Sequence, residues 1–155
     1  MGRRSGWMAG IAVLGLMLAG CGDGKVEKAG ASTLFHLKTG DCFESSAGTA
    51  GRTVGIKDVT IVPCEGVHDG EVFAVVTHPA GKDAAWPGDD AVADFAAAEC
   101  LQQFPGYTGS SYDDSDLEVA SVRPDADSWK DKDDREVACV LYQQGSTLTG
   151  SRRKA

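Results

Sequence analysis

Aromatic side chains are scarce in this chain of 155 residues, where they make up 7% of the composition. A hydrophobic core with few large side chains gains from covalent cross-links. Basic stripes are also missing, because 15 Lys and Arg stand against 23 Asp and Glu, for a net charge of −8. A chain this acidic repels phosphate backbones, so we expect no nucleic-acid partner.

No apolar run is long enough to span a bilayer, which needs about 20 residues. The run Met8–Leu18 has eleven residues, is broken only by Gly10 and Gly15, and follows Arg3 and Arg4. A positive start before a short apolar stretch is typical of an export signal.

The export signal ends in Leu18-Ala19-Gly20-Cys21, which resembles the lipobox of bacterial lipoproteins. The small residues let a signal peptidase cut before Cys21, and its thiol takes the lipid. We expect 1–20 to be a lipoprotein signal peptide and 21–33 a flexible tether. The lipid on Cys21 would hold the chain at the extracytoplasmic face of the cell membrane. An ordinary cleaved signal with a chance cysteine is the alternative.

Four cysteines remain after Cys21, and an exported chain with an even number of them favours two disulfides. Four cysteines allow three pairings, which sequence alone does not decide. We favour Cys42–Cys64, joining neighbouring strands, and Cys100–Cys139, tying a helix to a later strand. The gaps are too long for a four-thiolate zinc site, and no Cys-x-x-Cys redox motif is present.

Hydrophobic patterning predicts an α+β domain over 34–151, with a small antiparallel sheet and one main packed helix. Expected strands are Leu34–Leu37, Val59–Val62, Glu71–Thr77 (central), Leu117–Val122, Glu136–Tyr142 and an edge strand in Thr147–Ser151. The helix should begin at a cap on Asp89 or Asp90 and end at Pro105-Gly106. Residues 152–155 read as a solvated basic tail.

No catalytic set is assembled in the sequence. A Gly-x-Ser-x-Gly elbow is missing. His68 and Asp69 are adjacent on extended chain, so their side chains point to opposite sides. His36 and His78 lack metal-ligand spacing. We therefore expect no enzyme activity, no metal and no cofactor.

Residues 125–136 imitate a calcium-binding loop without completing it. Asp125, Asp127 and Glu136 fit the EF-hand template, but Trp129 and Lys130 occupy positions that need an oxygen ligand and a glycine. An EF-hand is rejected, and irregular weak calcium binding is the alternative.

Trp86 and Trp129 both fall in expected loops. Exposed tryptophans often mark recognition sites, but in a core poor in aromatics both residues could instead cover the sheet.

Several motifs together resemble the septum formation domain of actinobacterial envelope lipoproteins, over about 34–151. They are Gly40-Asp41-Cys42-Phe43, Val62-Pro63-Cys64 followed by His68, Glu71-Val72-Phe73, Cys100, Trp129 before Arg135, Cys139, and Leu148-Thr149-Gly150-Ser151. The family pattern has a glycine shortly before the arginine. This chain departs from it, because Asp133 and Asp134 precede Arg135. The resemblance implies a small extracytoplasmic domain with two disulfides, held at the membrane by a lipid or a helix, near division and the cell wall. It supplies no catalytic residues.

We therefore expect a lipid-anchored binding or scaffold domain with envelope or division proteins as partners. Candidate recognition residues are His68, Trp86, Trp129 and Arg135. One alternative is a small wall-acting hydrolase or transferase in which folding brings a carboxylate to His68. Another is a small-ligand-binding lipoprotein with Trp86 or Trp129 in a cleft.

Overall fold

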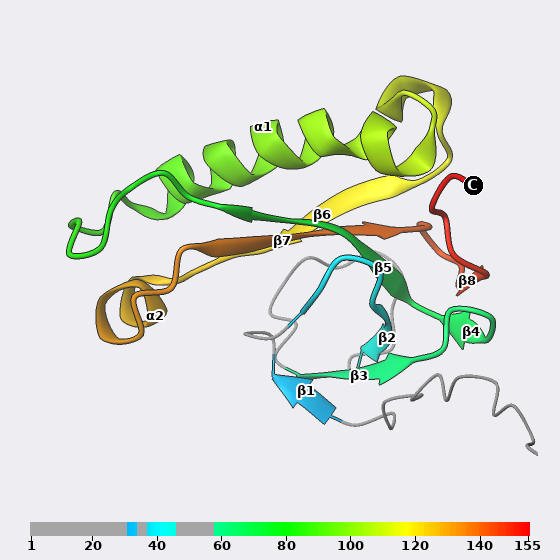
Figure 1. Ribbon diagram of the computed structural model, residues 1–155, viewed down its shortest axis with the longest axis horizontal. Coiled ribbons are helices and arrows are strands. Elements are labelled where there is room, and N and C mark those ends of the chain that lie inside the picture. Colours follow the sequence, from blue (N-terminus) through cyan, green and yellow to red (C-terminus); the bar gives the residue numbers. More distant parts are fainter. Residues whose placement is uncertain (1–30, 34–36, 46–57) are drawn as a thin grey trace, which may run out of the picture.

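The computed structural model describes residues 31–33, 37–45 and 58–155. The signal peptide, Cys21, most of the tether, His36 and the expected strand up to residue 36 lie outside these residues. Within them the chain forms the expected α+β domain, with one long helix laid across an antiparallel sheet (Figure 1).

The main sheet has six antiparallel strands in the order β1-β3-β2-β5-β7-β6. These strands are β1 (Ala31–Thr33), β2 (Cys42–Ser45), β3 (Asp58–Val62), β5 (Gly70–Thr77), β6 (Glu118–Val122) and β7 (Glu136–Tyr142). The prediction that Glu71–Thr77 is central is confirmed, because β5 lies between β2 and β7. The expected C-terminal edge strand is β8 (Leu148–Thr149), which pairs with β4 (Val67–His68) in a separate two-stranded sheet.

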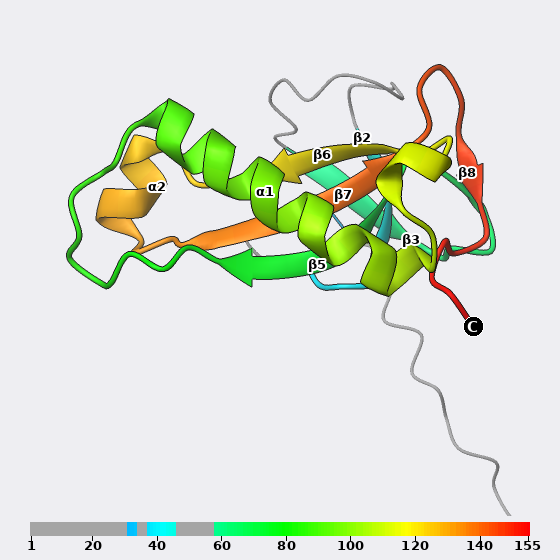
Figure 2. The ribbon, with the colours of Figure 1, turned by 90° about the horizontal axis from the view of Figure 1, so that it is seen from above.

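Successive side chains of β7 point to opposite faces of the sheet, and each face packs into its own hydrophobic cluster. Val137, Cys139 and Leu141 face α1 (Asp89–Thr108), as their spacing predicts, and α1 runs over β5, β7 and β6 (Figure 2). Ala138 and Val140 face the opposite side. There they meet Leu37, Phe43, Val59 and Val72 in a second cluster. Both faces of β5 and β7 are therefore buried.

The apolar face of α1 is as expected, but both of its ends differ from the prediction. Gly88 occupies the N-cap with no side-chain cap, and Asp89 and Asp90 lie in the first turn, where carboxylates favour the helix dipole. The helix passes through Pro105 to Thr108 and ends at Gly109, whose φ of 84° is left-handed. Pro105 has no backbone N–H, so the helix lacks one hydrogen bond there. The extra turn buries the Tyr107 side chain, and this burial stabilises the longer helix.

Both favoured disulfides are confirmed. Cys42 of β2 is bonded to Cys64, and Cys100 of α1 is bonded to Cys139 of β7. The second bond is fully buried and ties the helix to the sheet that it covers. Within the described part of the chain, no helix combines the length and the hydropathy that a membrane span requires.

Three other expectations need correction. The sheet begins at Ala31, because β1 pairs with β3 inside the segment expected to be a tether. The loop between β6 and β7 contains a short helix, α2 (Ala126–Asp131). The basic tail is not freely solvated, since the backbone amides of Arg152 and Lys154 donate to Glu71 and to the Tyr107 carbonyl.

Candidate functional site

Three of the four candidate recognition residues meet in one groove. Trp86, Trp129 and Arg135 line a hollow of about 840 Å³ between the loop after β5 and the α2 segment. That volume lies within the range of about 300–1,000 Å³ that is usual for ligand sites. Trp86 is 43 positions before Trp129 in the sequence, so only the fold brings them together.

Four ring side chains form an aromatic ladder that leads from α1 to this groove. Phe95 of α1 contacts His78, His78 contacts Trp129, and Trp129 contacts Trp86, with ring centroids 4.6, 5.0 and 5.2 Å apart. All three contacts are edge-to-face, the favoured geometry for such pairs. Trp129 is 2% exposed, whereas Trp86 is only half-buried. The ladder therefore fixes Trp86 as its accessible end.

Arg135 holds the groove together. Its guanidinium lies 3.7 Å from the centre of the Trp129 ring and donates to the carbonyls of Trp129 and Asp134. It also forms an ion pair with Asp133 at 3.2 Å. Because the side chain is buried and its two terminal nitrogens contact the protein's own groups, Arg135 positions the tryptophans, although its Nε has no partner among the described residues. The Trp129 indole N–H donates to the carbonyl of Ala84, which fixes the facing loop in the same way.

The two non-glycine residues of the described chain that have a positive φ both line this groove. They are Asp83, at 66°, and Asp133, at 52°. Aspartate tolerates this left-handed conformation better than most residues, and glycine adopts it freely. The departure at Asp133 from the glycine of the family pattern thus keeps a turn that a glycine would also make.

The α2 helix begins with a capping box. Asp125 accepts a hydrogen bond from the Ser128 amide at 2.7 Å, and the Ser128 hydroxyl accepts one from the Asp125 amide. The bond from the Ser128 amide lowers the pKa of the Asp125 carboxyl. The carboxylate that would open a calcium loop is therefore a helix cap, which explains the acidic start of this segment.

Replacing Asp125 with Ala should destabilise the domain by about 1 kcal/mol at pH 7, because the cap is lost. The folded pKa is lowered, so the stabilisation is present above the unfolded pKa and is lost as pH falls through the folded value. Urea unfolding of wild type and variant from pH 7 down to pH 2 should show the difference shrinking toward zero. A difference that stays constant over this range would contradict the cap.

Charged side chains of both signs surround the exposed part of Trp86. The exposed charged residues that line the groove are Lys82, Lys130, Lys132, Asp83, Asp127, Asp131 and Asp133. With Arg135, which pairs with Asp133, the lining holds four cations and four carboxylates, so the groove offers donors and acceptors without a dominant charge.

His68, the fourth candidate, lies elsewhere. It is fully buried on β4, and its Nδ1 lies 2.9 Å from the Gly66 carbonyl. Asp69 instead accepts from the amide and hydroxyl of Ser45, so the expectation that the two side chains diverge is met. Among the described residues, nothing bonds the His68 Nε2.

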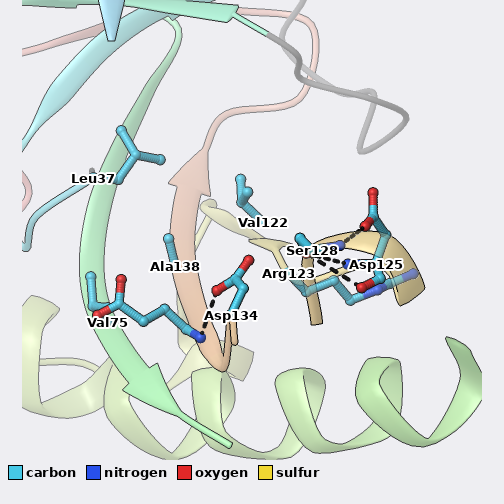
Figure 3. Close-up of a pocket in the computed structure, with 9 residues that line it drawn as sticks. Leu37, Val75, Val122, Arg123, Asp125, Ser128, Asp134 and Ala138 are labelled. Carbon is cyan, nitrogen blue, oxygen red and sulfur yellow. Dashed lines mark hydrogen bonds between the residues drawn. The ribbon is translucent and has the colours of Figure 1, made fainter. Parts of the chain in front are cut away.

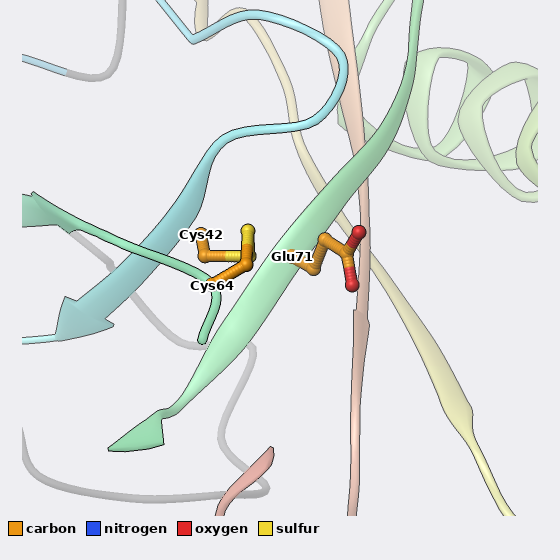
Figure 4. A group of neighbouring side chains, drawn as sticks. All are labelled: Cys42, Cys64 and Glu71. Carbon is orange, nitrogen blue, oxygen red and sulfur yellow. A yellow bond between two sulfur atoms is a disulfide. The ribbon is translucent and has the colours of Figure 1, made fainter. Parts of the chain in front are cut away.

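A buried carboxylate lies beside the Cys42–Cys64 disulfide (Figure 4). Glu71 of β5 accepts from the Tyr107 hydroxyl and the Ser151 hydroxyl, both at 2.5 Å, and from the Arg152 amide at 2.7 Å. The three side chains lie close enough to suggest a metal site, but both sulfurs are committed to the disulfide and the carboxylate to three donors. This cluster latches the C-terminal segment onto the domain.

A second hollow opens on the sheet face opposite α1 (Figure 3). Leu37, Val75, Val122 and Ala138 give it apolar walls, and its volume is about 120 Å³. This is well below the usual ligand-site range of about 300–1,000 Å³, so the tryptophan groove is the better candidate site.

The fold and the groove together define a small, disulfide-stabilised α+β domain with a tryptophan-lined groove on its surface. The chain belongs to the septum formation family, whose model matches residues 24–154. This membership links it to cell division or the cell envelope. Comparison with curated proteins and with solved structures gave no match.

The sequence predicts the two tryptophans and Arg135 as candidate residues, but it does not reveal the contacts of His78 or the α2 helix that position them. His78 is isolated in the sequence, and the α2 segment lies within a polar, acidic stretch between two strands. The pattern Asp125-x-x-Ser128 is a capping signal that could have revealed α2 and placed Trp129 on a helix.

Proposed function

We propose that this protein is a non-enzymatic, lipid-anchored binding domain that acts on the extracytoplasmic face of the membrane during septum formation. The observation that carries the proposal is the groove in which Trp86 is presented by Trp129 and Arg135. Membership of the septum formation family supports the setting. The lipobox-like Leu18–Cys21 segment supports the anchor.

Rigid presentation favours binding through Trp86. An aromatic side chain that is already held in place loses little entropy when a ligand packs against it. Trp86 is held by the ring of Trp129, whose indole nitrogen and backbone are both fixed by hydrogen bonds. Recognition hot spots are rich in tryptophan for this reason.

The alternative of a hydrolase centred on His68 has less support from the geometry. His68 is fully buried, and neither the groove nor the smaller hollow includes it among its lining residues. General acid–base catalysis needs the imidazole within hydrogen-bond reach of a reacting group. A binding role requires no such arrangement.

Fractionation of cells that produce wild type, Cys21→Ala, Trp86→Ala or Leu101→Ala tests both parts of this proposal. Leu101 is exposed on α1, outside the groove, and serves as the matched control. Cys21→Ala should leave the membrane fraction, whereas the other variants should stay in it. Detergent should then release Trp86→Ala from the insoluble envelope more readily than wild type or Leu101→Ala. Equal membrane retention of Cys21→Ala would refute the anchor, and equal envelope retention of Trp86→Ala would refute the groove.

A further inference from the structure

We infer that the groove takes a neutral glycan chain, with the Trp86 indole as the platform for one sugar ring. This inference rests on the proposed function, since it names the ligand class of the same groove. Three features carry it: the accessible aromatic ring, the balanced charges around it, and the lack of surfaces that a peptide would use.

The indole of Trp86 suits the face of a sugar. An aromatic face carries partial negative charge, which attracts the weakly positive C–H groups on one side of a sugar ring. Trp86 meets Trp129 edge-to-face at 76°, so this contact covers at most one of the two flat surfaces of the Trp86 ring. A flat, fixed platform binds a flat, rigid ring at low entropic cost.

The charged residues around Trp86 suit hydroxyl groups. A hydroxyl both donates and accepts, so a sugar can give hydrogen bonds to Asp127 or Asp131 and accept them from Lys82 or Lys130. Three lysines and Arg135 face four aspartates in the groove lining, so the groove produces no strong field for a charged polymer. The net charge of −8 also works against a polyanion.

A peptide finds little of what it needs here. Extended peptides add to a strand edge, and amphipathic helices need a wide apolar groove. The groove is lined by residues 82–86 and by most of residues 126–135, and none of these residues belongs to a strand. Apart from the tryptophans, its apolar residues are only the small Ala84, Ala85 and Ala126. A proline-rich ligand needs a row of exposed aromatics, but Trp129 is buried.

Intrinsic fluorescence reports this groove selectively. The chain has tryptophans at positions 7, 86 and 129. A Trp7→Phe background leaves only the two groove tryptophans, whether or not the signal peptide is removed. The full chain, solubilised in detergent, is titrated with a tetrasaccharide of N-acetylglucosamine and, separately, with tetra-alanine.

The tetrasaccharide should produce a saturable shift in emission, and tetra-alanine should produce none. Trp86→Ala should weaken saccharide binding at least about tenfold by calorimetry, Trp86→Tyr should retain part of it, and Leu101→Ala should leave it unchanged. Circular dichroism verifies that each variant is folded. No saccharide binding, or a response only to the peptide, would overturn the glycan inference. Envelope retention that still depends on Trp86 would then show that the groove binds another ligand, so the two failures are distinguishable.

Discussion

Replacing Glu71 with Ala should cost about 3–5 kcal/mol of unfolding free energy, among the largest single-residue effects that we expect in this domain, because hydrogen bonds to a buried carboxylate are lost and a cavity remains. The carboxylate is fully buried and accepts from Tyr107, Ser151 and Arg152. Without it, the buried Tyr107 hydroxyl loses its acceptor and a cavity remains. The C-terminal segment loses two of its anchoring bonds at the same time.

Glu71→Gln separates charge from shape. Both hydroxyls donate to one carboxylate oxygen and the Arg152 amide donates to the other, so all three neighbours are donors. A glutamine side chain must point its own N–H₂ group at one of them. We expect a loss of about 1–3 kcal/mol, intermediate between wild type and Ala. Urea unfolding measures both variants, and a Gln variant as stable as wild type would contradict the three-donor arrangement.

Alkaline pH gives an independent readout of the same cluster. Burial, reinforced by the hydrogen bond to Glu71, raises the pKa of Tyr107 to about 12. Because the folded pKa is raised, the stabilisation is full below the unfolded pKa of about 10 and is lost as pH rises toward 12. Tyr107→Phe should remove this part of the alkaline destabilisation.

Replacing both Cys100 and Cys139 with Ala should cost about 4 kcal/mol, because the bond closes a loop with a sequence separation of 39. Both sulfurs lie in the core among Phe73, Phe104 and Leu141, so lost packing adds to the loss of the cross-link. The far-ultraviolet circular dichroism spectrum should stay that of a folded domain. The melting temperature should fall by about 16–32 °C, on the usual scale of about 4–8 °C per kcal/mol for small domains.

The matched control is the Cys42→Ala, Cys64→Ala pair. Its loop is shorter, with a sequence separation of 22, and Cys64 is partly exposed. The expected loss is therefore smaller, at about 3 kcal/mol. If this pair cost more than the Cys100 and Cys139 pair, burial and loop length would not be the factors that decide the contribution of each bond.

Local patterns predicted the parts of the fold that depend on neighbours along the chain. Alternation placed Val137, Cys139 and Leu141 on one face of a strand, and helical spacing placed Cys100 on the core side of α1. These two faces must meet, which is why the favoured disulfide proved correct. The α2 helix has only six residues, too few for hydrophobic periodicity to reveal it.

The candidate site depended on contacts that no local pattern carries. In the sequence, Trp86 and Trp129 are two separate loop residues. Their segments are brought together in the fold by the hydrogen bond from the Trp129 indole to the Ala84 carbonyl. Glu71 read as one polar residue in an apolar strand, because its donors come from α1 and from the C-terminal segment. A polar side chain inside a central strand is a signal of such a partner, but its position in the chain does not say which one.

The recognition role of Trp86 is tested most directly by the position of the protein in dividing cells. Full-length wild type, Trp86→Ala and Leu101→Ala, each with a small epitope tag after residue 155, are scored for enrichment at septa. Trp86→Ala should remain on the membrane, since Cys21 is intact, but should spread evenly around the cell, whereas the other two proteins should concentrate at septa. Septal enrichment of Trp86→Ala equal to that of wild type would contradict the groove as the surface through which this protein acts.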